Sequence, residues 1–269
     1  MTPIRLGCVS YLNARPLVYG LERNPRFAVR FDVPAECARL LHAHEIDLGL
    51  IPSIEYLRGP RPYDIVIGPG VTSNGPVASV AIYTRKNPRD VRSIAMDSTS
   101  RTSVALATVL MRRVFNVKPQ PVAMSPDLER MLNTADAALL IGDYALFVDH
   151  EALGVQKIDL GRLWTEHTGL PFVYAFWAGW PGAVDVDAVS MLQDARDAGA
   201  AHLDEIARSF FPDAVGRQKI ASRYLRDNIR YAFDGAEALN RFFRYADEEG
   251  LVSFDGELRF YHAVDREHR

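Results

Sequence analysis

Short apolar runs alternate with amphipathic stretches along the first two thirds of the chain. Residues 4–9, 46–51 and 137–141 are apolar runs of strand length, whereas residues 100–115 repeat apolar side chains on one helical face. Alternation of strands and helices predicts mixed or parallel sheets covered by helices. We therefore expect an α/β fold.

The same pattern extends to the rest of the chain. Further strands are expected at residues 27–33, 65–67, 77–83, 93–96 and 172–177, with a strand or loop at 155–160. Helices are expected at residues 13–21, 34–44, 128–134, 186–210, 214–225 and 237–249. Gly250 ends the last of these helices as a C-terminal glycine. The tail at 251–264 is expected to form a small strand pair or an extended segment.

Loop-like composition divides the chain into two expected lobes. Residues 84–90, which include Lys86-Asn87-Pro88, separate two strand–helix blocks, and Gly179-Trp180-Pro181-Gly182 marks a return. Lobe I is expected to comprise residues 1–84 and 178–269, and lobe II residues 85–177. A cleft between two lobes is a usual place for a small ligand.

Composition narrows the classes of function. The 269 residues carry 31 Lys and Arg against 34 Asp and Glu, a balance that argues against nucleic-acid binding and against a polybasic membrane surface. Two cysteines are too few for a disulfide framework or a zinc cluster. The sequence predicts no signal peptide and contains no apolar run of about 18 residues, so we expect a cytoplasmic protein without a membrane span.

Polar side chains follow several of the expected strands of the first block. Ser10 and Asn13 come directly after the first strand, where α/β sheets bind ligands, although Asn13 is equally suited to cap the next helix. Ser53 follows the strand at 46–51, and its local setting favours a helix cap. Asn74 and Ser79 lie where the chain leaves the first lobe, and a hydroxyl there either reaches the cleft or bonds to nearby backbone.

The stretch at residues 97–103 has the strongest chemical signal. It joins a strand to an amphipathic helix and carries five hydroxyl side chains and Arg101. The N-terminus of a helix attracts anions, and Ser100, Arg101 and Thr102 supply more donors than capping requires, which favours carboxylate binding. Asp143 follows another buried strand and is either a carboxylate in the cleft or a helix cap; local composition favours the cap.

Signatures of several common enzyme classes are missing from the sequence. It contains no spaced His or Cys ligands for a metal, no Gly-x-Gly-x-x-Gly after the first strand and no Gly-x-Ser-x-Gly. The histidines are scattered, and His167, beside the second crossover, either approaches the cleft or is a structural or solvated histidine, which its setting favours. These absences argue against a metal site and against a bound dinucleotide.

The segment Ser10-Tyr11-Leu12-Asn13-Ala14-Arg15-Pro16-Leu17 resembles that of the chorismate dehydratases, a family of the futalosine-dependent route to menaquinone. The Ile51-Pro52-Ser53 turn, the loop at 73–76 with Ser79, and the 98–103 stretch follow in the same order. The first segment is specific to this family at that position, whereas each of the other segments is weak evidence when taken alone. The resemblance runs from residue 4 to about residue 177, and the helical last third matches only in length and character.

The resemblance implies a two-lobed fold like that of the type II periplasmic binding proteins, with a ligand cleft between the lobes. It also implies a lyase that needs neither metal nor cofactor and converts chorismate to 3-[(1-carboxyvinyl)oxy]benzoate and water. Asn13 and Ser79 would then act in catalysis. The substrate would be bound by Ser10, Ser53, Asn74, Ser100, Arg101, Thr102 and Asp143.

No base stands out in the matched segments, so we expect the enolpyruvyl carboxylate of the substrate to take the proton, with Asp143 and His167 as fallback bases. Other interpretations remain open. They are a solute-binding protein for a small carboxylate, the related naphthoate-forming enzyme, and the sensing domain of a regulator, which no helix-turn-helix accompanies. Chorismate is the only expected partner, and the sequence does not indicate whether the chain forms a homo-oligomer.

Overall fold

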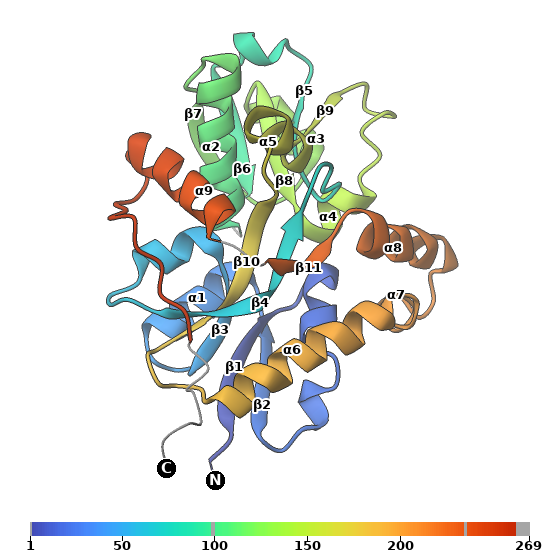
Figure 1. Ribbon diagram of the computed structural model, residues 1–269. Helices are drawn as coiled ribbons and strands as arrows, with labels where there is room; N and C mark the ends of the chain where they lie inside the picture. Colours follow the sequence, from blue (N-terminus) through green and yellow to red (C-terminus); the bar gives the residue numbers. More distant parts are fainter. Residues whose placement is uncertain (1, 98–99, 234–235, 262–269) are drawn as a thin grey trace.

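A computed structural model describes residues 2–97, 100–233 and 236–261, and it contains two sheets flanked by helices (Figure 1). Over these residues, the first sheet has six strands in the order β11-β4-β10-β3-β1-β2. Its strands are β1 (Ile4–Val9), β2 (Phe27–Asp32), β3 (Leu48–Pro52), β4 (Asp64–Ser73), β10 (Phe172–Gly179) and β11 (Arg230–Phe233). β1 pairs in parallel with β2 and β3, whereas β10 is antiparallel to both of its neighbours, β3 and β4.

The second sheet has five strands within the described ranges, in the order β7-β6-β8-β5-β9. They are β5 (Val80–Thr84), β6 (Ser93–Asp97), β7 (Gln120–Met124), β8 (Ala137–Ile141) and β9 (Gln156–Asp159). Alternate residues of these strands face two different hydrophobic clusters, as the period of a strand requires. In β5, Val80 and Ile82 join the large core, while Ala81 and Tyr83 join a smaller one on the other face.

Helices cover both sheets. The lower part of Figure 1 holds the first sheet with α1 and α6, and the upper part holds the second sheet with α2, α3 and α5. The α-helices are α1 (Pro34–His42), α2 (Arg101–Phe115), α3 (Leu128–Thr134), α4 (Gly142–Phe147), α5 (Leu160–Thr168), α6 (Val186–Ala201), α7 (Leu203–Phe210), α8 (Val215–Asp227) and α9 (Glu237–Glu248). Four 3₁₀ segments of the described chain are η1 (Leu12–Val18), η2 (Leu21–Arg23), η3 (Ser53–Arg58) and η4 (Pro88–Asp90).

The chain passes between the sheets twice, and both crossings come earlier than the sequence suggests. β4 pairs in the first sheet and β5 in the second, so the first crossing lies at residues 74–79. The return lies between α5 and β10. The expected boundary at 84/85 places β5 in lobe I, although β5 pairs in the second sheet, and the boundary at 177/178 places most of β10 in lobe II, although β10 pairs in the first sheet. Both boundaries are displaced because the loop-like composition lies one strand beyond each crossing.

Most expected elements are present, with a few corrections. The expected helix at 186–210 is two helices that meet at His202, and the expected helix at 13–21 is the 3₁₀ segment η1. The strand at 65–67 continues as β4 to Ser73. Sequence patterns missed α4, α5, β7 and β11. The described part of the tail, up to residue 261, is irregular apart from one bridge between Ile65 and Phe260. Residues 262–264 lie outside the described residues.

None of the described helices has the length and apolar character needed to cross a membrane.

Candidate functional site

A cavity lies between the two sheets, where the first crossing meets the starts of η1, α2 and α4. Most of its lining is apolar, including Val9, Leu50, Val71 and Ile141. The polar or aromatic residues of the lining are Tyr11, Asn13, Ser79, Ser100, Thr102, Ser103 and Tyr174. Among the described residues, no Lys or Arg lines this cavity. A largely apolar cavity with a few convergent donors is typical of a site for a small organic ligand.

Three side chains from distant parts of the chain meet at one edge of the cavity. The hydroxyl oxygens of Ser79 and Tyr224 lie 2.8 Å apart and share a hydrogen bond, and Asn13 also hydrogen-bonds to Tyr224. Burial raises the pKa of Tyr224, which therefore stays a neutral hydroxyl. Asn13 does not cap η1, whose cap position is Tyr11, so its amide is engaged with Tyr224 rather than with the start of the helix.

The N-terminus of α2 forms another wall of the cavity. Ser100 caps this 15-residue helix: its Oγ accepts a hydrogen bond from the Ser103 N–H and donates one to the Ser103 Oγ. Thr102 Oγ1 accepts from the Ile54 N–H at 3.2 Å and lies 3.4 Å from Ser53 Oγ, which ties α2 to η3. The positive end of the helix dipole thus faces the cavity and favours a negatively charged group there. The expected stretch also included Ser98 and Thr99, which lie outside the described residues.

Asp143 links the start of α4 to η1. The Leu12 N–H donates to its Oδ1 at 3.4 Å. Burial raises the pKa of this carboxyl to about 6, against the opposing effects of the Leu12 hydrogen bond and the charge of Arg15. Asp143 itself does not line the cavity, but the preceding residue, Gly142, does. Gly142 has φ +63°, and a Cβ there would lie 3.3 Å from the Tyr11 ring, so glycine suits this approach of the two lobes.

The structure brings together only part of the expected site. Asn13, Ser79, Ser100 and Thr102 line the cavity, whereas the other five expected residues, Asp143 among them, do not. Ser10 is half-buried beside β2, Ser53 is buried against Thr102, Asn74 is exposed, and Arg101 is exposed with its guanidinium 3.9 Å from Glu55.

His167 is also exposed and lies against the ring of Tyr245.

Two tyrosines of the site were missed by sequence reasoning. Tyr174 lines the cavity and shares a 3.2 Å hydrogen bond with Ser73, and Tyr224 bonds to both Asn13 and Ser79. Tyr224 belongs to an amphipathic helix, in which an aromatic residue is typical of a core position. Tyr174 likewise belongs to β10, a strand that is buried at almost every position. No local signal marks either residue as part of a site.

Within the described residues, no group of three or more His, Cys, Asp or Glu side chains is placed to hold a metal ion. The polar groups of the cavity are hydroxyls, one amide and the backbone N–H groups at the start of α2. Such groups bind and orient carboxylates and stabilise negative charge by hydrogen bonding.

Comparisons with solved structures show the fold. A protein of Archaeoglobus fulgidus described as AF1704 matches with TM-score 0.72 and 16% identity, covering 93% of this chain and 99% of that one. The periplasmic aliphatic sulphonate binding protein of Escherichia coli matches with TM-score 0.70 and 17% identity, covering 100% of this chain and 95% of that one. The chain therefore has the expected periplasmic-binding-protein-like α/β fold.

Comparisons of sequence show the family. A chorismate dehydratase of Thermus thermophilus is 32% identical over 255 residues, which cover 89% of this chain and 93% of the relative. One of Campylobacter jejuni is 32% identical over 177 residues, covering 63% and 64%. A family model described as menaquinone biosynthesis matches residues 4–248. The chain belongs to this menaquinone biosynthesis family.

Proposed function

We propose that the protein is a chorismate dehydratase, a hydro-lyase that converts chorismate to 3-[(1-carboxyvinyl)oxy]benzoate and water. The observation that carries this proposal is the apolar cavity whose donors are Asn13, Ser79 and the N-terminus of α2. The relatives in Thermus thermophilus and Campylobacter jejuni carry the same name. Chorismate has two carboxylates on a small carbon skeleton, and these features suit such a lining.

The reaction needs little beyond geometry and charge stabilisation. The ring carbon that bears the enol ether loses its proton, and the electron pair spreads through the conjugated ring to the ring carboxylate. The bond to the neighbouring hydroxyl then breaks, the hydroxyl leaves as water with the abstracted proton, and the ring becomes aromatic. Donors held in place before the reaction stabilise the charge that grows on the ring carboxylate.

We propose the enolpyruvyl carboxylate of the substrate as the base. The lining of the cavity supports this assignment, because its described side chains are hydroxyls, an amide and apolar groups. Ser100 and Thr102, at the positive end of α2, are proposed to bind a carboxylate of the substrate, and Asn13 to orient the ring or the leaving hydroxyl. Asp143 is proposed as a neighbour that sets the position of η1 through the Leu12 N–H.

We also propose a cytoplasmic location, which is supported by two buried cysteines with free thiols, Cys8 and Cys37. Free thiols are typical of proteins in reducing compartments.

The test is to incubate the purified chain with chorismate and to follow products by chromatography and mass spectrometry. We expect catalytic formation of a product lighter than chorismate by one water, with the absorbance of a substituted benzoate. Chorismate that binds but stays unchanged would contradict the proposal and favour a solute-binding role, which the fold also serves. Absence of both binding and turnover would favour the naphthoate-forming enzyme, to be tested next with its own substrate.

A further inference from the structure

Two side chains of β9 hold the first crossing between the sheets. The carboxylate of Asp159 accepts hydrogen bonds from two successive backbone N–H groups, those of Val77 at 3.0 Å and Ala78 at 2.7 Å. Lys157 Nζ donates to the Ala78 carbonyl oxygen at 2.7 Å. The peptide groups on both sides of Ala78 are thus bound by charged side chains of one strand.

The crossing is held in an unusual conformation. Ala78 has φ +63°, in the left-handed region that residues with a Cβ seldom adopt. The Ser79 N–H donates to the Val77 carbonyl oxygen at 2.7 Å, which closes a tight turn around Ala78. A conformation of this kind persists only where the surroundings enforce it. Asp159 and Lys157 both hydrogen-bond to the backbone of this turn.

The turn determines where the Ser79 hydroxyl points. Ser79 is 1% exposed, lines the cavity, and shares its hydrogen bond with Tyr224, which is 2% exposed. Asp159 and Lys157 do not line this cavity. A rotation of the Ala78 peptide would move the Ser79 hydroxyl away from both Tyr224 and the cavity, while the strands on either side stayed paired.

We propose that Asp159, assisted by Lys157, is a positioning residue that fixes the Ser79 hydroxyl against Tyr224 and the cavity. The effect on turnover rests on the dehydratase function proposed above, whereas the effect on geometry does not.

Asp159 also has a purely structural contact, so an experiment must separate the two roles. Its Oδ1 accepts from the Arg162 N–H at 3.0 Å and thereby caps α5. Loss of this cap alone would lower stability without affecting Ser79.

The first measurement is a double-mutant cycle on turnover with Asp159→Asn and Ser79→Ala. The amide of asparagine keeps one acceptor oxygen but places an NH₂ group against a backbone donor. We expect Asp159→Asn to lower kcat about tenfold or more with a smaller change in KM, because small misplacements of a reacting group are costly. In the Ser79→Ala background the same change should alter kcat less than about twofold, since residues acting through one group are not additive.

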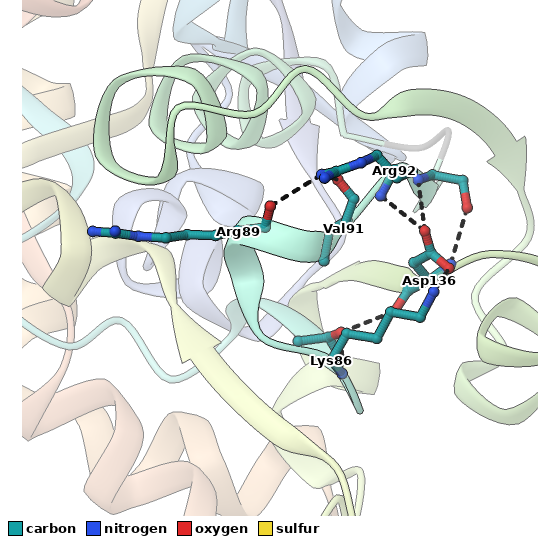
Figure 2. Close-up of polar contacts among 7 residues, drawn as sticks. Lys86, Arg89, Val91, Arg92 and Asp136 are labelled. Carbon is teal, nitrogen blue, oxygen red and sulfur yellow. Dashed lines mark hydrogen bonds and ion pairs between the residues drawn. The ribbon is translucent and has the colours of Figure 1, made fainter.

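Asp136 offers a matched control. Its carboxylate likewise accepts from two successive backbone N–H groups, those of Arg92 at 2.8 Å and Ser93 at 3.1 Å, and from Lys86 Nζ at 2.5 Å (Figure 2). None of these four residues lines the cavity. Asp136→Asn should therefore lower the melting temperature but leave kcat and KM unchanged in both backgrounds.

The second measurement does not depend on turnover. With 3-fluorotyrosine incorporated at position 224, the ¹⁹F chemical shift reports on the hydrogen bond shared with Ser79. We expect Asp159→Asn to move this signal in the same direction as Ser79→Ala, and Asp136→Asn to leave it in place.

The outcomes separate the two proposals. An unchanged ¹⁹F signal in Asp159→Asn, or a loss of kcat equal in both Ser79 backgrounds, would overturn the positioning role. A wild-type protein that does not convert chorismate would overturn the dehydratase function, and the ¹⁹F signal would still decide the role of Asp159.

Discussion

Tyr224 connects two parts of the site that lie far apart in the sequence. Its hydroxyl hydrogen-bonds to Ser79 on the first crossing and to Asn13 in η1. Because the hydroxyl is buried and neutral, its loss leaves two polar side chains without their partner in a water-poor setting. We therefore expect Tyr224 to affect turnover, although it lies outside the segments that resemble the chorismate dehydratases.

Replacement of Tyr224 by Phe removes this hydroxyl with little change in volume. We expect kcat/KM to fall about 10- to 100-fold, which is less than the roughly 100- to 1000-fold loss for a donor that contacts the reacting group, because Tyr224 acts through Ser79 and Asn13. Steady-state kinetics with chorismate check the result. Tyr231→Phe is the matched control: its hydroxyl donates to the Leu225 carbonyl at 2.9 Å away from the cavity, so it should lower stability but not turnover. Equal kinetic effects of the two changes would contradict the assignment.

Asp143 predicts a specific dependence of stability on pH. Burial raises its pKa from 3.8 to about 6, so the carboxyl holds its proton more strongly in the folded protein than in the unfolded chain. Ionisation then opposes folding, and this cost grows between about pH 4 and pH 6 and stays constant above. A shift of one pKa unit corresponds to about 1.4 kcal/mol, and solvent near the partly buried carboxyl reduces this cost. We therefore expect Asp143→Asn to raise the free energy of unfolding by about 2 kcal/mol at pH 7.5. At pH 4 it should have little effect.

Urea unfolding at both pH values measures this difference. Asp136→Asn serves as the control of opposite sign, since hydrogen bonds from Lys86 and the Arg92 N–H hold the pKa of Asp136 at about 2. That carboxylate stabilises the folded state above the pKa of the unfolded chain, and this stability is lost only as the pH falls from about 4 toward about 2. Asp136→Asn should therefore destabilise the protein at both pH 4 and pH 7.5. An Asp143→Asn effect that is the same at pH 4 and pH 7.5 would refute the inferred burial cost.

Sequence reasoning identified polar residues of the site near the ends of strands and missed tyrosines that resemble core residues. Asn13 follows β1 of the first sheet, where ligand sites of α/β folds are expected, and Ser79 directly precedes β5 of the second sheet. Tyr224 lies in α8, and Asp159 reads as an ordinary helix cap, which it also is. Only the folded arrangement shows that these two contact Ser79 or its turn. Arg101 was expected to line the site, but its guanidinium is directed toward Glu55 rather than into the cavity.

At the scale of elements, α6 holds η1 in place. A Cβ at Gly199 of α6 would lie only 2.0 Å from the Pro16 carbonyl oxygen, so the backbones of the two elements are in direct contact. η1 carries Asn13 and the Leu12 N–H that binds Asp143. The packing of a helix outside the cavity therefore sets the position of one of its walls.

Gly199→Ala should push η1 and α6 apart. Overpacking at rigid backbone costs about 1–3 kcal/mol, so we expect a loss of that size in the free energy of unfolding, with a lower kcat/KM because Asn13 moves. Chemical denaturation and steady-state kinetics check both effects. Gly216→Ala in α8 is the control, since a Cβ there meets no atom within 4 Å, and it should stabilise the helix by at most about 1 kcal/mol. Wild-type stability in Gly199→Ala would contradict the close contact.

Buried strands with a clear apolar pattern were predicted from the sequence, whereas β7 and β11, at the edges of their sheets, were not. β8 is buried at all five positions and was predicted with its observed bounds. β7 is a half-exposed edge strand that begins Gln120-Pro121, so its sequence carries little hydrophobic signal. The helix expected at 186–210 breaks at His202, whose Nδ1 contacts the Ala198 carbonyl oxygen at 2.7 Å. The apolar period continues through this break, so the pattern does not reveal it.

At the scale of the whole molecule, contacts between the two halves surround the cavity. Thr102 of α2 accepts from the Ile54 N–H of η3, Asp143 of α4 accepts from Leu12, and Arg101 faces Glu55. The large hydrophobic core also includes residues of both sheets. The site is thus formed where the halves meet, and no single continuous segment of the chain supplies it. This explains why local sequence patterns predicted the two-lobed fold more fully than the site.

The position of β10 has a consequence for the order in which the protein acquires its structure during synthesis. β10 lies between β3 and β4 in the first sheet, yet it follows every strand of the second sheet along the chain. As the chain leaves the ribosome from its N-terminus, the second sheet can complete its pairing while the first still lacks the strand that joins its two parts. The half of the molecule that begins the sequence is therefore the last to close, and the cavity, whose last lining residues are Tyr174 and Ala175, forms only after β10 has been made.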